Sequence, residues 1–374
     1  MSAAGRSRLR VLFALPHVAR GGGAERIMLT LLRHIDRDSF EPRLLVLDAA
    51  SNESADAIPA DVPLIDLGVS RVRYAGRPLL RVLRQTQPDV LVSGLGHLNL
   101  MVAMMRPFMP KGLGVIGRET AVVTAFNSDF RTSSLRNLAY RWFYSRLDQV
   151  VCQSEDMRDD LTGPLAFPAD RIRLIPNPVD VAGVRAQAAL PVQSSTCDQR
   201  LRLVAVGRLA PQKGFDLLVD AIADLPRGSC RLDIIGEGPL RASLAAQIAR
   251  LGLQDSITLV GFQANPYSLM RRADALVLSS RYEGLPNVVL ESLACGTPVI
   301  GTPCPGGIRE IARRVGGVTI AASVSAPALA AAIDRFARGR HLPPTIDLSD
   351  YRLESVVRQY EDLIRQVAAQ KKGP

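Results

Sequence analysis

Two glutamates in the second half of the chain have the spacing that most clearly indicates chemistry. Glu283 and Glu291 are separated by seven residues in the stretch RYEGLPNVVLE, where a loop is expected to lead into a helix. The amide groups of Gly284, Leu285 and Asn287 would then point into the loop and form an anion site between the two carboxylates. This arrangement suits a ligand with hydroxyls at both ends and phosphates between them, such as a nucleotide-sugar. The alternative is that Glu283 is a helix-terminal charge and that Glu291 is solvated.

Two cations stand in a second loop. Arg208 and Lys213 lie five residues apart in GRLAPQKG, directly after the apolar run Leu203–Val206, which is typical of a buried strand. Open α/β sheets bind their ligands at the carboxyl ends of the strands. Lys213 is one of only four lysines in the chain, which favours a position where a compact ammonium group is useful. Together the two side chains could neutralise a diphosphate.

A third loop is rich in glycine. Gly21, Gly22 and Gly23 stand between the first expected strand and the first expected helix, where backbone amides can approach a phosphate. The dinucleotide-binding pattern G-x-G-x-x-G is absent. A tight turn from strand to helix is the alternative interpretation.

These loops must be positioned by regular elements, and the chain alternates short apolar runs with helical stretches. The runs are rich in Val, Ile and Leu without polar alternation, which is typical of parallel strands covered on both faces. The candidate strands are 11–15, 43–47, 64–67, 89–92, 114–116, 149–152, 172–175, 203–206, 232–235, 257–259, 275–278, 299–300 and 318–320. This repetition predicts an α/β fold with two Rossmann-like, doubly wound parallel-sheet domains.

The borders of the domains follow from breaks in this rhythm. A polar stretch that contains QSSTCDQR predicts a linker. After Pro343 and Pro344, an apolar stripe at helical spacing predicts a last helix that must pack on another part of the chain. The predicted organisation is an N-terminal domain at 1–181, a linker at 182–200, a C-terminal domain at 201–345, and a C-terminal helix with a frayed tail at 346–374.

The charge of the chain is concentrated in one region. The 374 residues carry 46 Lys and Arg against 36 Asp and Glu, a formal net charge of +10, in an otherwise ordinary globular composition that excludes a disordered or fibrous protein. Between Arg71 and Arg146, twelve basic residues face three acids, a net charge of +9. This excess predicts a polyanionic partner, and a merely solvated basic face is the alternative.

Cysteine, histidine and apolar patterns exclude several classes. The five cysteines are scattered without a C-x-x-C pair and the four histidines lack metal-ligand spacing, so neither a metal site nor a disulfide framework is expected. No apolar run approaches the ~20 residues of a membrane-spanning helix. The first apolar run is too short for a signal peptide, and a cytosolic location is expected. The apolar stretch 98–110, with four methionines, is either a buried helix or an interfacial membrane anchor.

Three motifs together resemble a known family. GRLAPQKGFDLLVDAI, IIGEGPLR and RYEGLPNVVLESLACGTPVIGTPCPGG resemble the retaining GT-B glycosyltransferases, and more narrowly glycosyltransferase family 4, also called glycosyl transferases group 1. The resemblance is most specific from Gly207 to Gly307 and is looser before the linker, where GGGAER and IPNPVD carry it. It implies a GT-B fold, in which two Rossmann-like domains face a central cleft and a C-terminal helix crosses back to the N-terminal domain.

The resemblance also implies which residues bind the donor. Glu283, Arg208 and Lys213 would be catalytic, with the two cations on the donor diphosphate and Glu283 on the sugar hydroxyls. Glu291 would contact the ribose. The implied donor-binding residues are Gly22, Gly23, Gly236, Gly284, Leu285, Asn287 and Glu291. Transfer would retain the anomeric configuration without a metal or a cofactor, because cationic side chains and helix dipoles stabilise the departing nucleoside diphosphate.

One departure from the family concerns the acceptor. Many members carry a histidine at the end of an N-terminal-domain strand, where this chain has Arg118 and Glu119. That pair resembles members that build lipid-linked or surface oligosaccharides, so both residues are candidate acceptor groups. His97 is a further candidate, and a structural role is the alternative for it. Which group takes the acceptor proton stays open.

The sequence therefore predicts a retaining, metal-independent hexosyl- or N-acetylhexosaminyltransferase. It would move a sugar from a nucleoside-diphosphate sugar to a membrane-associated acceptor, either lipid-linked or of the lipopolysaccharide or exopolysaccharide type. The expected location is cytoplasmic, peripheral on the inner face of the plasma membrane, with an anionic membrane surface rather than nucleic acid as the partner. The alternatives are a GT-B-type nucleotide-sugar epimerase or phosphorylase, and a catalytically silent GT-B scaffold subunit.

Overall fold

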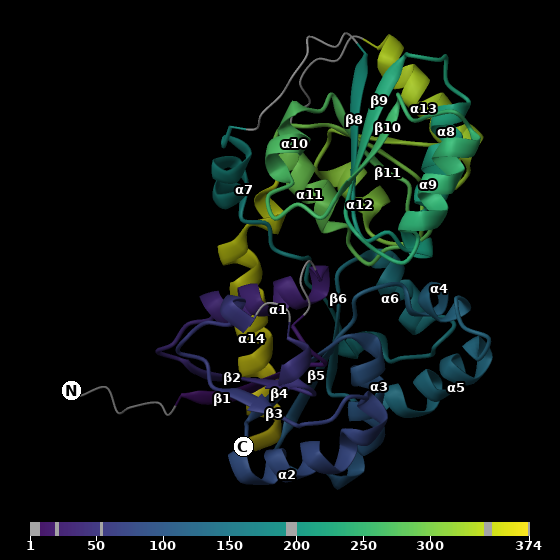
Figure 1. Ribbon diagram of the computed structural model, residues 1–374. Coiled ribbons are helices and arrows are strands. Elements are labelled where there is room, and N and C mark those ends of the chain that lie inside the picture. The colour runs from purple at the N-terminus through teal and green to yellow at the C-terminus, as the bar shows by residue number, and fades with distance from the viewer. Residues whose placement is uncertain (1–7, 19–21, 53–54, 192–199, 340–345, 373–374) are drawn as a thin grey trace. The chain divides into compact units, whose positions relative to one another are not determined.

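The structure is a computed structural model that describes residues 8–18, 22–52, 55–191, 200–339 and 346–372 (Figure 1). Contacts between residues divide the chain into two compact units. The first unit comprises Met1–Pro178 and Leu353–Pro374, and the second comprises Val179–Arg352. Each unit is built on one parallel sheet.

The first unit has a seven-stranded sheet in the order β3-β2-β1-β4-β5-β6-β7. Its strands are β1 (Leu9–Leu15), β2 (Phe40–Val46), β3 (Leu64–Asp66), β4 (Val90–Gly94), β5 (Gly114–Arg118), β6 (Gln149–Cys152) and β7 (Ile172–Leu174). Its helices are α1 (Gly23–His34), α2 (Gly76–Thr86), α3 (Gly96–Met105), α4 (Val123–Ser128), α5 (Ser133–Phe143), α6 (Glu155–Thr162) and α14 (Leu353–Lys372).

Both faces of this sheet are buried, as the apolar runs predicted. Along β1, Val11, Phe13 and Leu15 enter one hydrophobic cluster, while Leu12 and Ala14 enter another. The first cluster contains side chains of α1 and α14, and the second contains side chains of α2 and α3. Alternate residues of a strand point to opposite faces, so a strand covered on both sides needs apolar residues at every position.

The second unit has a six-stranded sheet in the order β10-β9-β8-β11-β12-β13. Its strands are β8 (Leu201–Val206), β9 (Cys230–Ile235), β10 (Ile257–Gly261), β11 (Ala275–Leu278), β12 (Val299–Gly301) and β13 (Val318–Ile320). Its helices are α7 (Val181–Ala188), α8 (Phe215–Ala223), α9 (Arg241–Arg250), α10 (Tyr267–Arg272), α11 (Asn287–Ala294), α12 (Ile308–Arg314) and α13 (Ala326–Arg338).

Both sheets have the doubly wound order, and this order locates the ligand loops. In the second unit the strand sequence reverses direction between β8 and β11, which are neighbours in the sheet. Ligands of such sheets bind beside the carboxyl ends of the strands at this switch point. The loops that follow β8 and β11 are the two that carry Arg208, Lys213 and Glu283.

Helix α14 packs within the first unit although it ends the chain. Val356, Tyr360 and Ile364 lie in the same hydrophobic cluster as β1 and β4. A Cβ built on Gly114 of β5 would lie 2.5 Å from Cγ1 of Val367, so the helix approaches this strand closely. The Glu361 carboxylate also accepts from the backbone N–H of Asp36 at 2.9 Å.

The proposed borders at 181 and 346 differ from the contact-based division. The chain passes between the units after Pro178 and again after Arg352, and a β-bridge joins Val179 to Arg352. Leu348 and Tyr351 belong to the hydrophobic core of the second unit, so only the residues from Leu353 onward form the returning helix. Pro343 and Pro344 lie outside the described residues.

The prediction of a linker over 182–200 was wrong for its first part. Residues Val181–Ala188 form helix α7, and Asp180 caps it by accepting a hydrogen bond from the N–H of Gly183. Val184 and Ala188 are buried in the core of the second unit. Their spacing of four residues places them on one face of a helix, a signal that the polar composition downstream obscured. Residues 192–199 lie outside the described part of the chain.

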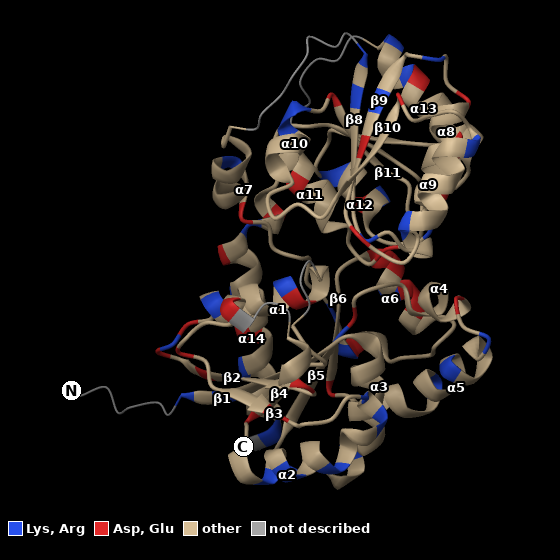
Figure 2. Ribbon diagram, viewed as in Figure 1, with Lys and Arg blue, Asp and Glu red and all other residues tan. Residues whose placement is uncertain are grey.

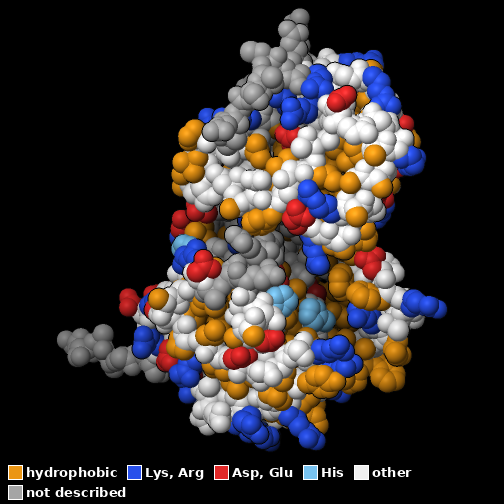
Figure 3. Space-filling model, viewed as in Figure 1, with side chains coloured by type: hydrophobic (Ala, Val, Ile, Leu, Met, Phe, Trp, Pro, Cys, Tyr) orange, Lys and Arg blue, Asp and Glu red, His pale blue; other side chains and the backbone are white. Residues whose placement is uncertain are grey.

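The basic region lies in the first unit. Lys and Arg outnumber Asp and Glu along α2 and α5 (Figure 2). Apolar side chains stand beside basic ones on the surface over this part of the unit (Figure 3). Among the described helices, none is long and apolar enough to cross a membrane.

Candidate functional site

Two loops meet at the switch point of the second unit. Lys213 ends a 3-10 turn, Pro211–Lys213, after β8, and Glu283 stands in the loop after β11. The Lys213 Nζ atom lies 2.7 Å from Glu283 Oε1, and the carboxylate is buried. The pair joins a buried carboxylate to a half-buried ammonium group, and removing the ammonium group would leave the buried carboxylate without its counter-charge.

Hydrogen bonds hold the two loops together around this pair. The Ser280 hydroxyl donates to Glu283 Oε1 at 2.6 Å, and the Ser279 hydroxyl donates to the Lys213 carbonyl at 2.8 Å. The Arg281 amide donates to the Gln212 carbonyl at 2.7 Å. Both the hydroxyl of Ser280 and the ammonium group of Lys213 bind the same carboxylate oxygen, so the orientation of the carboxylate is set before any ligand arrives.

A salt bridge fixes the outer side of the same loops. The Arg281 guanidinium donates to both carboxylate oxygens of Asp216, at 2.8 and 2.6 Å, and also to the Pro211 carbonyl. The hydrogen bonds from Arg281 lower the pKa of Asp216. Asp216 is in the first turn of α8, so this pair joins the loop after β11 to the start of that helix.

Glycines allow the loop backbones to approach one another. Gly214 has a φ of +61°, and a Cβ on it would lie 2.2 Å from the Ser279 carbonyl oxygen. Gly236 follows β9 with a φ of +144°, and a Cβ there would lie 1.9 Å from the Gly207 carbonyl oxygen. Only glycine fits at such contacts. The amide of Gly236 donates to the Gly261 carbonyl, so in this structure Gly236 contributes close backbone packing.

The remaining predicted donor residues lie in the same loops or on the helix that follows them. Glu291 lies on α11, which begins at Asn287, and its carboxylate is buried, as is the side chain of Leu285. Arg208, directly after β8, is exposed. The Gly284 carbonyl accepts from the amide of Gly307, which ties this loop to the start of α12. The structure therefore brings Arg208, Lys213, Glu283 and Glu291 to the carboxyl edge of one sheet.

The buried glutamates also raise the pKa of neighbouring thiols. Burial raises the pKa of Cys304 to about 12, and the negative charge of Glu283 adds to this. Burial and the charge of Glu291 raise the pKa of Cys295 to about 11. Both thiols are therefore protonated at neutral pH and are not nucleophiles.

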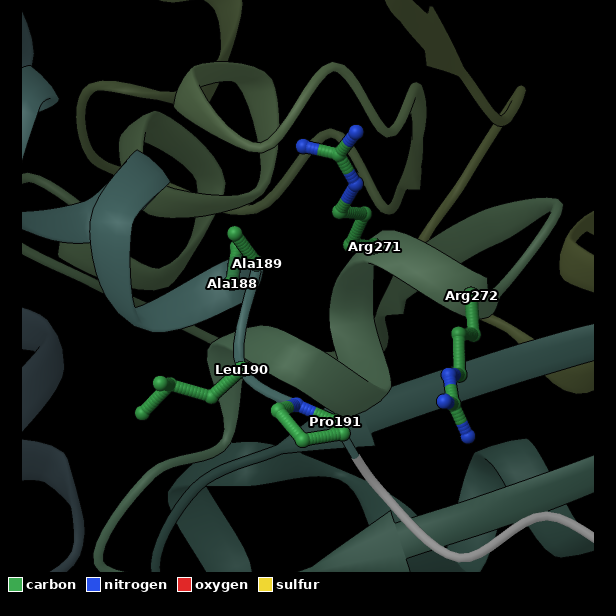
Figure 4. Close-up of a pocket in the computed structure, with 6 residues that line it drawn as sticks. All are labelled: Ala188, Ala189, Leu190, Pro191, Arg271 and Arg272. Atoms are coloured by element: carbon green, nitrogen blue, oxygen red, sulfur yellow. The ribbon is translucent and has the colours of Figure 1, made fainter.

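A separate pocket lies elsewhere in the second unit. Its volume is about 320 Å³, and its lining residues are Ala188, Ala189, Leu190, Pro191, Arg271 and Arg272 (Figure 4). Arg272 ends α10, just before β11 begins, whereas Lys213 and Glu283 follow the carboxyl ends of their strands. The pocket is thus distinct from the loop site.

The acceptor candidates lie in the first unit. His97 is in the first turn of α3, after β4, and is exposed. Partial desolvation lowers the pKa of His97, and the positive charges of Arg136 and His17 lower it further. His17 follows β1, the neighbour of β4 in the sheet, so the two histidines share one carboxyl edge.

Arg118 ends β5 and is among the most buried large side chains, with 1% exposure. Its Nη2 donates to Asn177 Oδ1 at 2.6 Å and its Nε donates to the Tyr360 hydroxyl at 3.2 Å. Within the described part of the chain, its Nη1 has no hydrogen-bond partner. Asn177 belongs to the IPNPVD motif and Tyr360 to α14, so two segments distant in the sequence bind this guanidinium.

Glu119 is enclosed by a different set of groups. Its Oε1 accepts from Asn99 Nδ2 at 3.2 Å and from the Tyr144 hydroxyl. A Cβ on Gly96 would collide with both the Tyr140 hydroxyl and Glu119 Oε2, so these two groups leave no room for a side chain at that position. Burial raises the pKa of Glu119 to about 7. The predicted Arg-Glu pair is therefore buried, and its two members have different partners.

The glycine-rich loop is only partly described, since Gly21 lies outside the described residues. Gly22 precedes α1, and Gly23 begins it. A Cβ on Gly22 would lie 2.3 Å from Glu25 Oε2, because the buried Glu25 side chain folds back onto this glycine. The chain thus places its own carboxylate beside the first turn of α1.

Several residues of the site were missed by the sequence interpretation. Ser279 and Ser280 directly precede the RYEG motif, and their position after a buried strand was the available signal. Gly214 and Gly306 were also missed; Gly306 has a φ of +124°, and a Cβ on it would lie 2.6 Å from the Glu283 carbonyl oxygen. In the described residues, no group of three or more His, Cys, Asp or Glu could hold a metal ion.

Family models match both halves of the chain. The model for Glycosyltransferase Family 4 matches residues 21–182, and the model for Glycosyl transferases group 1 matches residues 189–346. The first matched region lies in the first unit apart from its residues 179–182, and the second lies within the second unit.

Curated relatives are similar over much of the chain. An uncharacterized glycosyltransferase of Methanocaldococcus jannaschii is 25% identical over 62% of this chain and 60% of its own length. A relative from Campylobacter jejuni, named N-acetylgalactosamine-N,N'-diacetylbacillosaminyl-diphospho-undecaprenol 4-alpha-N-acetylgalactosaminyltransferase, is 26% identical over 78% of this chain and 80% of its own length. The lipopolysaccharide core biosynthesis glycosyltransferase LpsD of Rhizobium meliloti is 28% identical over 78% of both chains.

A solved structure has the same fold. The Anabaena protein HepE, crystallised with UDP and glucose, superposes with a TM-score of 0.76 at 18% identity and covers 96% of this chain and 100% of its own. This similarity, together with the two parallel-sheet units, confirms the predicted GT-B fold. The chain is a GT-B glycosyltransferase that resembles glycosyltransferase family 4 along both of its halves.

Proposed function

We propose that the enzyme transfers a hexosyl or N-acetylhexosaminyl group from a nucleoside-diphosphate sugar to a membrane-associated glycan acceptor, with retention of anomeric configuration and without a metal or cofactor. The main support for this proposal is the ion pair between Lys213 and Glu283 at the switch point of the second sheet, in which Nζ and Oε1 lie 2.7 Å apart. A compact cation and a fixed carboxylate side by side suit a ligand that joins a diphosphate to a sugar.

In this proposal the cations act on the leaving group. When the bond between the anomeric carbon and the phosphate oxygen breaks, the electron pair stays on the nucleoside diphosphate. Lys213 and the exposed Arg208 stabilise this charge, as do amide groups of Gly284, Leu285 and Asn287 near the start of α11. Such fixed positive groups supply what a divalent cation supplies in other enzymes, which is the basis for proposing metal independence.

The carboxylates orient the donor at its two ends. Glu283, held by Lys213 and Ser280, binds hydroxyls of the donor sugar, and Glu291 on α11 binds the ribose. Gly22 and Gly23 in the first unit bind the donor diphosphate through backbone amides, and Gly236 shapes the site by close packing. The UDP and glucose bound by the Anabaena protein support a donor of this class and make UDP-sugars the first donors to test.

The acceptor proposal depends on the first unit and on the relatives. The Campylobacter relative is named for a diphospho-undecaprenol-linked acceptor and the Rhizobium relative for lipopolysaccharide core biosynthesis. We place His97 and Arg118 at the acceptor side, Arg118 through the nitrogen for which no protein partner is described. Glu119 positions its neighbours. The enzyme would work at the inner face of the plasma membrane, peripherally attached, with an anionic membrane surface as its partner.

The test is a transfer assay with defined substrates. A panel of nucleoside-diphosphate sugars is first screened by thermal stabilisation, and the best donor is incubated with polyprenyl-diphosphate-linked and lipopolysaccharide-type acceptors, with and without a chelator. A glycosylated product with the donor's anomeric configuration, formed equally with chelator, is expected. Conversion of the donor alone into an isomer would instead indicate an epimerase, and binding without turnover on any acceptor would indicate a silent scaffold.

A further inference from the structure

Helix α5 has two apolar faces. Tyr140 faces inward and is buried in a hydrophobic cluster of the first unit. Leu135, Leu138 and Trp142 recur at intervals of three and four residues and are 67%, 41% and 67% exposed. Side chains at this spacing lie on one side of a helix. A surface helix ordinarily exposes polar residues on the side away from the core, so an exposed apolar stripe needs an explanation.

The charges around this stripe have one sign. From Arg131 to Leu147 the chain carries four arginines and no acid. Arg131, Arg141 and Arg146 are exposed, and the Arg146 guanidinium lies 4.8 Å from the centre of the Phe143 ring. Several helix arginines in other parts of the described chain pair with carboxylates one turn away, as Arg241 does with Glu237. The stripe on α5 is therefore a mixture of apolar and basic groups without the acids that usually accompany them.

Exposed hydrophobic residues also occur in and just after a helix that contacts α5. Helix α3 packs against α5, and Met104 of α3 and Phe108 just after it are among the exposed large hydrophobic residues. Figure 3 shows hydrophobic and basic side chains close together over the part of the unit in which Figure 1 labels α3 and α5.

The stretch 98–110, for which a membrane anchor was one of two alternatives, lies partly in the core. Leu98, Val102 and Met109 within it are buried. They form part of a hydrophobic cluster of the first unit. The stretch is therefore buried in part, with Met104 and Phe108 exposed, and the larger exposed apolar group lies on α5.

We propose that the α5 surface, defined as Leu135, Leu138 and Trp142 with Arg131, Arg141 and Arg146, docks the first unit on an anionic lipid bilayer. Tryptophan and leucine enter the interfacial layer, while arginines extend their charged ends to lipid phosphates. Residues 131–147 carry four arginines and no acid, so this stretch is attracted to negative lipid. This deepens the function proposed above by naming the surface through which the enzyme reaches a membrane-associated acceptor.

The only tryptophan of the chain is Trp142, so its fluorescence reports on this surface alone. The full-length protein is titrated with vesicles of phosphatidylcholine and with vesicles that also contain phosphatidylglycerol. With the anionic vesicles the emission is expected to shift to the blue and to become protected from acrylamide, and added salt is expected to weaken binding. An equal response to neutral vesicles, or none to either kind, would overturn the proposal.

Two double variants test the apolar and the basic part separately. Leu135→Ser with Leu138→Ser keeps the fluorescent reporter and should lower the partition coefficient at least tenfold, since both side chains lose their apolar burial. Arg131→Gln with Arg141→Gln should lower it about thirtyfold at low salt. The matched controls are Leu190→Ser, at an exposed leucine of the second unit, and Arg250→Gln with Arg338→Gln, which removes the same charge elsewhere.

The controls make the result specific. Unchanged partitioning in the α5 variants, or an equal loss in the control variants, would show that this surface is not the docking site. Affinity for nucleoside diphosphate, measured by calorimetry without vesicles, should be the same in all variants. For the unsubstituted protein, donor binding without vesicle binding contradicts only the docking surface, whereas vesicle binding without any donor binding contradicts only the proposed transferase function.

Discussion

The ammonium group of Lys213 lies 2.7 Å from a carboxylate oxygen of Glu283, although 70 residues separate the two in the chain. One follows β8 and the other follows β11, and these strands are neighbours at the switch point of the second sheet. The pair is therefore a product of strand order. It sits where doubly wound sheets bind ligands, and the following predictions examine its role and that of the buried groups of the first unit.

Replacing Lys213 should weaken donor binding. Lys213→Ala removes a charge-assisted hydrogen bond, so affinity for UDP, or for the nucleoside diphosphate selected by the screen, is expected to fall about 10- to 100-fold in calorimetry. Arg338→Ala, a surface arginine of the same unit, is the control. The single variant also leaves the buried Glu283 carboxylate without its counter-charge. The double variant Lys213→Ala with Glu283→Gln should therefore recover the free energy of unfolding but not the affinity for the nucleoside diphosphate. Unchanged affinity in both would refute the diphosphate role.

Ser280 should matter more for turnover than for binding. Ser280→Ala removes the 2.6 Å hydrogen bond that orients Glu283, and a loss of about 1 kcal/mol corresponds to a roughly fivefold fall in the rate of nucleoside diphosphate release. The donor KM should change little, because the cation on the diphosphate is intact. Ser279→Ala is the matched control, since that hydroxyl binds the Lys213 carbonyl and not the carboxylate. Equal kinetic effects of the two variants would contradict this assignment.

Gly214 should be irreplaceable for steric reasons. Gly214 and Gly252 have φ values of +61° and +63°, but a Cβ would lie 2.2 Å from the Ser279 carbonyl oxygen at Gly214 and would meet nothing within 4 Å at Gly252. Gly252→Ala should cost about 1–2 kcal/mol for its backbone conformation. Gly214→Ala should cost roughly 1–3 kcal/mol more, from the overlap. Denaturant unfolding measures both, and equal costs would show that the loop relaxes freely.

The buried Glu119 should make stability depend on pH. Burial raises the pKa of Glu119 from 4.5 to about 7. Between these two pH values the carboxyl group keeps its proton in the folded protein and has lost it in the unfolded chain. Wild-type stability should therefore fall as the pH rises from about 4.5 to 7, by up to ~1.4 kcal/mol per pH unit. Relative to wild type, Glu119→Gln should gain stability over this window and then level off.

A matched variant separates this effect from the general titration of the protein. Glu354→Gln, at an exposed glutamate in the first turn of α14, should follow the wild-type pH profile in thermal unfolding. A Glu119→Gln profile parallel to wild type would mean that the carboxyl is ionised in the folded protein throughout the window.

The sequence predicted the two sheets well because their strands are buried on both faces. Runs such as Val11–Leu15 and Ala275–Leu278 contain only apolar residues, and between helical stretches such short runs are typical of the strands of a parallel sheet. Helix α7 was missed because its apolar side chains are few and a polar stretch follows it. Its stability comes from packing on α10 and α11, which no local pattern records.

The sequence by itself determined the kinds of groups at the candidate site and the loops that carry them: cations after β8, carboxylates around β11, and glycines where backbones must approach. Only the tertiary structure decided the partners. Strand order placed Lys213 against Glu283. Arg118 and Glu119 are adjacent in the sequence but have different partners. Arg118 donates to Asn177 and Tyr360, whereas Glu119 accepts from Asn99 and Tyr144. Residue type follows from local chemistry, whereas pairing depends on chain segments far apart in sequence that fold onto one another.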